Sequence, residues 1–266
     1  MADALGAWEN APLAYVLAEV KTELLADIKE YQPKIAGRLR EEYPIQRAVH
    51  STRLVASGAK MTVESEQDAA WECASPHNRV AVILRASGLV FHATDYRGSD
   101  DFLACLDKVV RIFAEEVKSV YVGRVGLRYV DFILPKVGES PETYVNPRLH
   151  LDLGLSPGNG PTATCVSLYP MPTGQLTLRY VRAQGDPKLP PDLTTTTLAP
   201  APIAVVRGNP DQFTAVLDTD RTIAFSPVER LDPSKIQGIF AEMRTDLRAA
   251  FRMATTDHAR KVWGAP

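Results

Sequence analysis

Arginines recur at strand spacing near the middle of the chain, and they are the residues best suited to bind a ligand. Arg124 and Arg128 share one face of the segment 120–135, VYVGRVGLRYVDFILP, because strand side chains alternate between two faces. The same alternation places three further arginines on single strand faces: Arg79, Arg85 and Arg179. Guanidinium groups pair bidentately with carboxylate or phosphate. A sheet face that collects these arginines would bind a protein partner or a polyanion; the alternative is a solvated face of mixed charge.

Asp218-Thr219-Asp220 is a weaker pattern, in which two carboxylates share one side of the chain and could form half of a divalent-metal site. Such a pair more often marks the end of a strand and a turn, and no metal is predicted. The five histidines show no HxxxH or HxH spacing typical of zinc ligands.

Motifs of the common catalytic and nucleotide-binding sites are absent from the sequence: no GxSxG, no GxxxxGK[ST] and no GxGxxG at a helix start. We therefore predict no catalytic residue and no cofactor, and a protein that is not an enzyme. An enzyme with a site assembled from scattered residues stays as an alternative, with these candidates: Asp218, Asp220, His92 and Arg128. Another is a small-ligand pocket between sheet and helices.

The elements that would position these residues follow one plan in two halves, residues 1–119 and 120–266. In the first half, apolar patterns predict a strand at 13–21 and a helix at 24–43 that includes Leu24 and is interrupted by Pro33. Short strand patterns follow at 48–56, 60–64, 70–73, 79–86 and 89–94. A helix capped by Ser99 or the aspartates after it then runs to about residue 117.

The second half begins with the strand at 120–135, whose odd-numbered positions are mostly apolar. A Pro- and Gly-rich stretch with a short helix at 141–146 comes next, and strand patterns follow at 163–169, 175–182, 203–208 and 212–218. Asp232 and Pro233 are typical of a helix start, as N-cap and first helical residue.

This order of elements predicts an α+β fold: a wide, curved antiparallel sheet made of two similar halves, each with strands and a long helix, and with the helices on one face. We expect the halves to join through the 120–135 strand as one continuous globular unit.

Composition points to an ordinary soluble protein, with 45% hydrophobic and 23% charged residues. The formal net charge of -2 does not favour nucleic acid as a partner. The three cysteines are distant from one another and predict reduced thiols. The sequence contains no apolar stretch long enough to span a membrane and no signal-peptide pattern, so we expect a cytoplasmic protein.

Three short motifs resemble those of a bacterial protein family of about this length: NAPL at 10–13, GRVGLRYVDF at 123–132 and TTDHARKVWG at 255–264. That family is scattered sporadically among genomes and has no assigned biochemical function. The resemblance implies one architecture along the chain and a role linked to mobile elements, phage defence or toxin–antitoxin systems. It implies no catalytic residue. The sequence thus favours a binding or accessory protein, with a homodimer through an exposed sheet edge as a further possibility.

Overall fold

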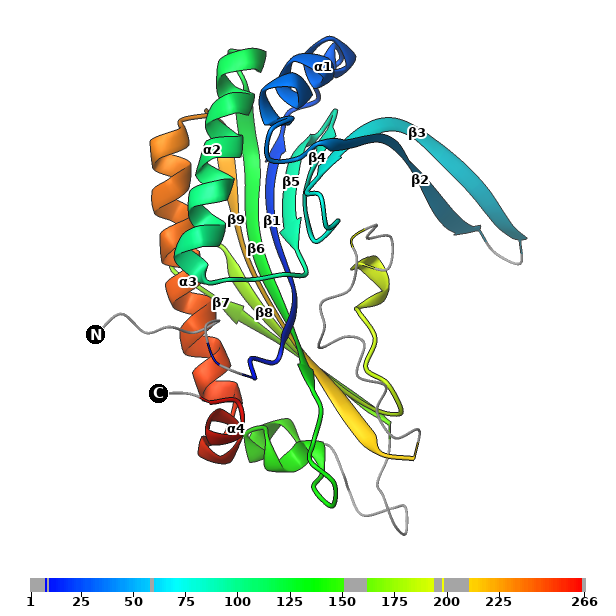
Figure 1. The fold of residues 1–266 in the computed structure, drawn as a ribbon, viewed down its shortest axis with the longest axis vertical. Coiled ribbons are helices and arrows are strands. Elements are labelled where there is room, and N and C mark those ends of the chain that lie inside the picture. Colours follow the sequence, from blue (N-terminus) through cyan, green and yellow to red (C-terminus); the bar gives the residue numbers. More distant parts are fainter. Residues whose placement is uncertain are drawn as a thin grey trace.

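Nine antiparallel strands form one open sheet in the order β2-β3-β4-β5-β1-β6-β9-β8-β7 (Figure 1). The computed structural model describes residues 8, 10–57, 60–150, 162–193, 198 and 211–264, without the side chains of residues 50–69. The strands in these residues are β1 Leu13–Thr22, β2 Ile45–Ser57, β3 Lys60–Ala74, β4 Val80–Arg85, β5 Gly88–Ala93, β6 Tyr121–Ile133, β7 Ala163–Pro170, β8 Gln175–Gln184 and β9 Phe213–Arg230.

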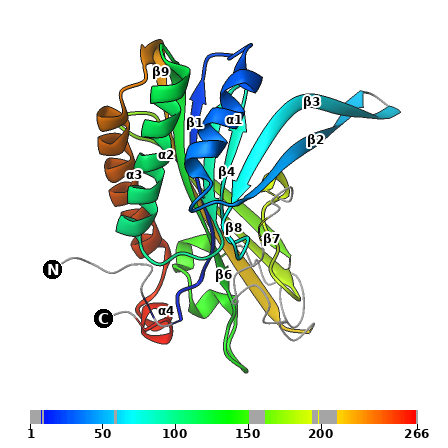
Figure 2. The same ribbon diagram turned by 45° about the horizontal axis from the view of Figure 1, so that its top comes forward.

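The helices of the described residues lie on one face of the sheet, and α2 and α3 run beside each other there (Figures 1 and 2). They are α1 Ile28–Leu39, α2 Ser99–Val117, α3 Pro233–Ala254 and α4 Asp257–Val262, with short 3-10 turns η1 Pro141–Thr143, η2 Pro147–Leu149 and η3 Pro191–Leu193. None of these helices is both long and apolar enough to cross a bilayer. The α+β prediction, with two similar halves and helices on one face, is confirmed.

The two halves meet at the centre of the sheet, where β1 pairs with β6. Each of these strands opens its half, and each takes the last strand of its own half as its other neighbour, β5 for β1 and β9 for β6. β6 is therefore an interior strand, as the sequence predicts. Gly123 is a β-bulge relative to β1, because Lys21 faces Arg124 and the next residue, Thr22, faces Val122. On the other side of β6, residues 225–228 of β9 lie opposite Gly123.

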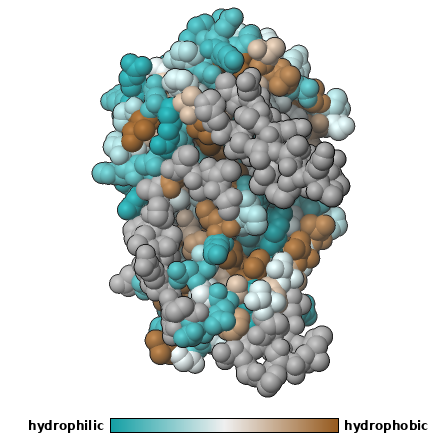
Figure 3. All heavy atoms as spheres, turned by 90° about the vertical axis from the view of Figure 1, so that its right-hand side faces the viewer, coloured by the Kyte–Doolittle hydropathy of each residue, from teal (hydrophilic) through white to brown (hydrophobic). Residues whose placement is uncertain are grey.

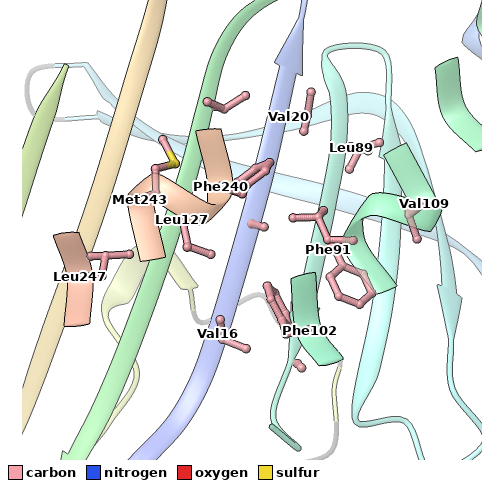
Figure 4. Packing of buried hydrophobic residues seen from close by; sticks show 14 of the residues in the cluster. Val16, Val20, Leu89, Phe91, Phe102, Val109, Leu127, Phe240, Met243 and Leu247 are labelled. Atoms are coloured by element: carbon pink, nitrogen blue, oxygen red, sulfur yellow. The ribbon is translucent and has the colours of Figure 1, made fainter. Parts of the chain in front are cut away.

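The main core fills the space between the sheet and the helices (Figure 4). Leu127 of β6 and Val16 of β1 face Phe102 of α2 and Phe240 and Leu247 of α3 in this cluster. Each such side chain contributes roughly 1.5–3 kcal/mol when it is fully buried. From Val125 onward the odd-numbered positions of β6 lie on the core side of the sheet. Before Gly123 the alternation is reversed, so Val122 is buried in this core and Tyr121 is exposed.

A second, smaller cluster lies on the other face of the sheet. Tyr15 of β1, Val130 and Phe132 of β6, and Val216 of β9 pack there with Leu193 of η3. We name this face, opposite α2 and α3, the arginine face. It is not simply open to solvent, because η3 covers part of it.

Local sequence explains where α3 begins. Asp232 is the N-cap residue, and its side chain accepts hydrogen bonds from the backbone N–H groups of Ser234 and Lys235. Pro233 follows at the first position, where its missing N–H is not used by the helix. The prediction for this helix start is correct.

Other element boundaries differ from those predicted. Helix α1 begins at Ile28, and Leu24 is 75% exposed, so Leu24 belongs to no apolar stripe. Gly98, and not Ser99, is the N-cap of α2, without a side-chain hydrogen bond. The patterns at 60–64 and 70–73 are parts of the single strand β3, because pairing with β2 continues between them. The strand predicted at 203–208 lies outside the described residues.

The C-terminal motif at 255–264 contributes to the core. Trp263 follows α4 and is 5% exposed. Its ring stacks on Trp8 at 6.5 Å between centroids and packs against Phe251 and Tyr144, both at 5.8 Å. The packing therefore ties the N-terminal segment, α3 and α4 together.

Candidate functional site

Neighbouring strands bring two of the predicted arginines to the same carboxylates on the arginine face. Residues that face each other in register share a side of the sheet. Arg128 of β6 lies between Leu17 of β1 and Asp220 of β9, and Arg179 of β8 faces Asp218 of β9. Arg128 and Arg179 thus converge on Asp218 from opposite sides of β9.

The guanidinium of Arg128 is held on two sides. Its Nε and Nη2 donate to Asp218 Oδ1 and Oδ2 at 2.7 and 2.8 Å. Its Nη1 and Nη2 donate to the carboxylate of Asp192 on η3 at 2.5 and 3.2 Å. Arg179 Nη1 donates to Asp218 Oδ2 at 3.1 Å. The side chains of Arg128 and Asp218 are 8% and 1% exposed, whereas that of Asp192 is 63% exposed. Asp218 therefore fixes Arg128 from within, and Asp192 closes its outward side.

The charges of this cluster are set by burial and pairing. Burial acts to lower the pKa of Arg128, but the hydrogen bonds to Asp218 and Asp192 outweigh it and the pKa is raised. The hydrogen bond from Arg128 lowers the pKa of Asp192. Burial raises the pKa of Asp220, although Arg128 and Arg179 act in the opposite direction. Arg128 and Asp192 are thus both charged at neutral pH.

Arg124 lies on the same face but at the edge of the cluster. Its Nη2 is 2.5 Å from Glu19 Oε2 on β1, in an exposed pair. Pairing places Arg124 opposite Lys21 of β1. The structure therefore groups Arg124 and Arg128 of β6 with Arg179 of β8, and β9 lies between these two strands.

In the strand order, the other two predicted arginines lie beyond β1 from β6, in or next to β4. Arg85 ends β4, and Arg79 precedes that strand. Three strand steps separate β4 from β6, which is about 14 Å at the usual strand spacing. Arg79 and Arg85 are thus on the arginine face but outside the cluster formed by Arg124, Arg128 and Arg179.

His92, a candidate in the enzyme alternative, is enclosed. It is 1% exposed, and its Nδ1 lies 2.8 Å from the hydroxyl of Tyr15. Burial lowers its pKa to about 3, with smaller effects from Arg85 and Arg47, so the imidazole is neutral. Leu17 lies between His92 and Arg128 in register. The imidazole therefore does not adjoin the guanidinium cluster.

The carboxylates of Asp218 and Asp220 face guanidinium groups and not a vacant ligand position. Arg128 and Arg179 occupy both oxygens of Asp218, and Arg179 lies 4.0 Å from Asp220. Among the described residues, no group of three or more His, Cys, Asp or Glu could hold a metal ion. Their arrangement is that of an ion-pair network.

A cavity lies on the other side of the sheet, between β6, β9 and the two long helices. It has about 510 Å³ of empty volume, part of it open to solvent. Tyr129 and Asp131 of β6 line its sheet side, together with Thr219 of β9, which faces Tyr129 in register. Arg244 and Arg248, one turn apart on α3, line its helix side. The remaining lining comes from the N-terminal segment, the start of β1, the loop between β5 and α2, α2 and α3: Trp8, Ala11, Pro12, Leu13, Tyr96, Ser99, Leu247 and Phe251.

Several polar groups in this cavity are buried without a partner. Thr219 Oγ1, Arg244 Nε, Arg248 Nη2 and Trp8 Nε1 form no hydrogen bond within the described part of the chain. Asp131 is 4% exposed, and burial, with a smaller effect of Asp218, raises its pKa to about 8. Buried polar groups normally have partners, so such a concentration suggests a ligand or bound water.

Sequence reasoning missed Asp192, and it kept a pocket between sheet and helices as an alternative without identifying the residues that line this cavity. Asp192 lies in a Pro- and Thr-rich segment with no periodic pattern, so nothing in the sequence relates it to Arg128. Asp131 did give a signal: it is a carboxylate at an odd-numbered position between Tyr129 and Ile133, on the apolar side of its strand.

Comparison with known proteins assigns no function, so a function is inferred from the chemistry of these sites. The sequence matches no protein-family model and no curated protein. The resemblance of its short motifs to a sporadic bacterial family therefore stays a prediction.

Proposed function

We propose that the arginine face binds an extended acidic segment of a partner protein along β6, β9, β8 and β7. Figure 3 looks onto this face and shows hydrophilic atoms in a hollow beside hydrophobic ones. The three clustered arginines alternate with three strand carboxylates: Glu19, Asp218 and Asp220. A nucleic-acid backbone carries a negative charge at every nucleotide and no apolar side chains, whereas in an extended protein segment carboxylates can alternate with apolar residues. This balance favours a protein partner over a polyanion.

The outer strand supports this proposal. Among the described strands, β7 pairs only with β8. Val166 and Leu168 face Arg179 and Thr177, so they lie on the arginine face, where they are 54% and 62% exposed. A free strand edge offers backbone N–H and C=O groups to a further strand, and exposed apolar side chains select its sequence.

The observation that carries the proposal is the pairing of Arg128 with Asp192. Asp218 holds Arg128 in place, and the outward side of the guanidinium is filled by a carboxylate from an exposed turn. A carboxylate of the partner segment would take the place of Asp192 with the same bidentate geometry. Apolar residues of that segment would then contact Val166 and Leu168.

Fluorescence anisotropy with synthetic peptides tests this function. The probe is a labelled peptide of alternating valine and glutamate, with a valine–serine peptide and single-stranded DNA as comparisons. We expect the acidic peptide to bind most tightly and to weaken as salt rises. L168E and R179A should each reduce its affinity about tenfold, which corresponds to about 1.4 kcal/mol. M253E is the matched control, because Met253 is 75% exposed and belongs to α3.

Equal affinity for the valine–serine peptide, or an unchanged affinity in L168E, would contradict the proposal. Tighter binding of DNA that depends on Arg179 would support a polyanion partner in its place. Sedimentation of the protein alone checks whether a second copy of the chain uses the edge of β7.

A further inference from the structure

The cavity between the sheet and α3 is lined by residues with unmatched hydrogen-bond donors. Arg244 Nε, Arg248 Nη2 and Trp8 Nε1 are buried donors without an acceptor. A buried donor that stays unpaired costs roughly 1–3 kcal/mol, and more when it is charged. Three such donors around one cavity suggest an acceptor group supplied from outside, and a carboxylate offers enough lone pairs for them.

Arg248 differs from the other arginines near the sheet in lacking a carboxylate. Arg128, Arg221 and Arg244 each pair with an aspartate, whereas no described residue forms an ion pair with Arg248. Arg244 also donates from Nη1 to Ser99 Oγ at 3.2 Å, at the start of α2. The guanidinium groups of Arg244 and Arg248 and the N-terminus of α2 would hold a negatively charged group of a ligand on the helix side of the cavity.

Groups that could accept hydrogen bonds from a positively charged ligand lie farther along β6. Asp131 is a buried carboxyl group to which no described side chain donates a hydrogen bond. Thr219 Oγ1 is also unmatched and comes from the neighbouring strand. Asp131 lies two residues beyond Tyr129, about 7 Å along the strand. Asp131, Arg244 and Arg248 line the same cavity, the carboxyl group from the sheet and the two guanidinium groups from α3.

We propose that this cavity binds a small zwitterion, an α-amino acid with an apolar side chain. Its carboxylate would accept from Arg248, Arg244 and Trp8, and its ammonium would donate to Asp131 and Thr219. Leu13, Leu247 and Phe251 would contact its side chain. One side of the cavity is open to solvent, so its empty volume of about 510 Å³ is an upper bound on the room for this ligand. This site is on the opposite side of the sheet from the arginine face and does not depend on the function proposed there.

Binding should release a proton. The free carboxyl of Asp131 is largely protonated at neutral pH, because burial raises its pKa to about 8. An ammonium beside it favours the charged form, so the bound state loses that proton. Calorimetry in two buffers of different ionisation enthalpy measures this release.

Isothermal titration calorimetry with L-leucine and L-phenylalanine is the test, on the full chain. The comparison ligands are the corresponding acids without the amine, the corresponding amines without the carboxylate, and inorganic phosphate. We expect an amino acid to bind at least about tenfold more tightly than any comparison ligand, since each lacks one charged contact. R248Q and D131N should each weaken binding about tenfold or more. R40Q, an exposed arginine at the end of α1, is the matched control.

Thermal unfolding of each variant separates binding from folding. D131N removes a buried ionisable group, so its folded state should be at least as stable as that of the unmodified protein. Loss of binding in a stable D131N protein supports the proposal. No binding of either amino acid at about 1 mM, or equally tight binding of the acid without the amine, would overturn it.

Discussion

Arg128 on β6 binds both carboxylate oxygens of Asp218 on β9, at 2.7 and 2.8 Å, although the two residues do not face each other in register. Arg128 faces Asp220, and Asp218 faces Val130. The diagonal pairing leaves the other side of Asp218 for Arg179. One buried carboxylate therefore orients two arginines, which is why the side chains of this face have fixed positions.

Replacing Asp218 tests that role. D218A leaves Arg128 buried beside an empty position, and we expect a loss of about 3–5 kcal/mol in the free energy of unfolding. Urea denaturation measures the loss. The exposed pair of Glu229 and Lys235 is the comparison, and E229A should change stability by at most about 1 kcal/mol. The double variant with Arg128→Met and Asp218→Leu should recover most of the loss; a stable single variant would show that Asp218 is not needed.

Removing the charge of Asp192 should increase binding to the arginine face. D192N cannot compete with an incoming carboxylate, so the acidic peptide described above should bind several-fold more tightly. Because Asp192 is 63% exposed, the free energy of unfolding should change by less than about 1 kcal/mol. D257N, an exposed aspartate on α4, is the control. Weaker peptide binding in D192N would mean that Asp192 supports the site and does not occupy it.

Asp131 and His92 give stability opposite dependences on pH. The folded state keeps a proton on Asp131 up to about pH 8, whereas the unfolded chain loses it near pH 4, so this residue lowers stability as pH rises between those values. Burial holds the pKa of His92 near 3, below its ordinary 6.5, so its contribution is present above pH 6.5 and is lost as pH falls toward 3.

D131N should therefore change the pH profile in a defined way. Its stability should rise up to about pH 6.5 and then level off, and at pH 7 it should exceed that of the unmodified protein by up to about 4 kcal/mol. Denaturant unfolding at several pH values measures the profile. A decline in stability between pH 6.5 and 8 that persists in D131N would assign that decline to another group.

Trp263 should be among the largest single contributors to stability. W263A removes the ring that packs on Trp8, Phe251 and Tyr144, and we expect a loss of about 3–5 kcal/mol. M253A, at an exposed position of α3, should stay within about 0.5 kcal/mol. Thermal unfolding compares the two; a small effect of W263A would mean that the C-terminal segment contributes little to the core.

Local patterns predicted the fold class because the periodicity of apolar residues indicates which side of each strand or helix is buried. Alternation along residues 120–135 predicted a strand with one apolar side, and Asp232-Pro233 predicted the start of α3. The length of β3 and the start of α1 were missed, because pairing with β2 and packing against the sheet decide those boundaries and neither is local.

The sequence by itself determined the elements, the interior place of β6 and the presence of arginines on one of its faces. Only the tertiary structure decided what those arginines meet, since Asp192 and Asp218 are 64 and 90 residues away from Arg128 along the chain. It likewise decided that Asp131, Arg248 and Trp8 line one cavity. The physical reason is that ion pairs and cavities depend on distances between segments far apart in sequence, on which the periodicity of a single segment carries no information.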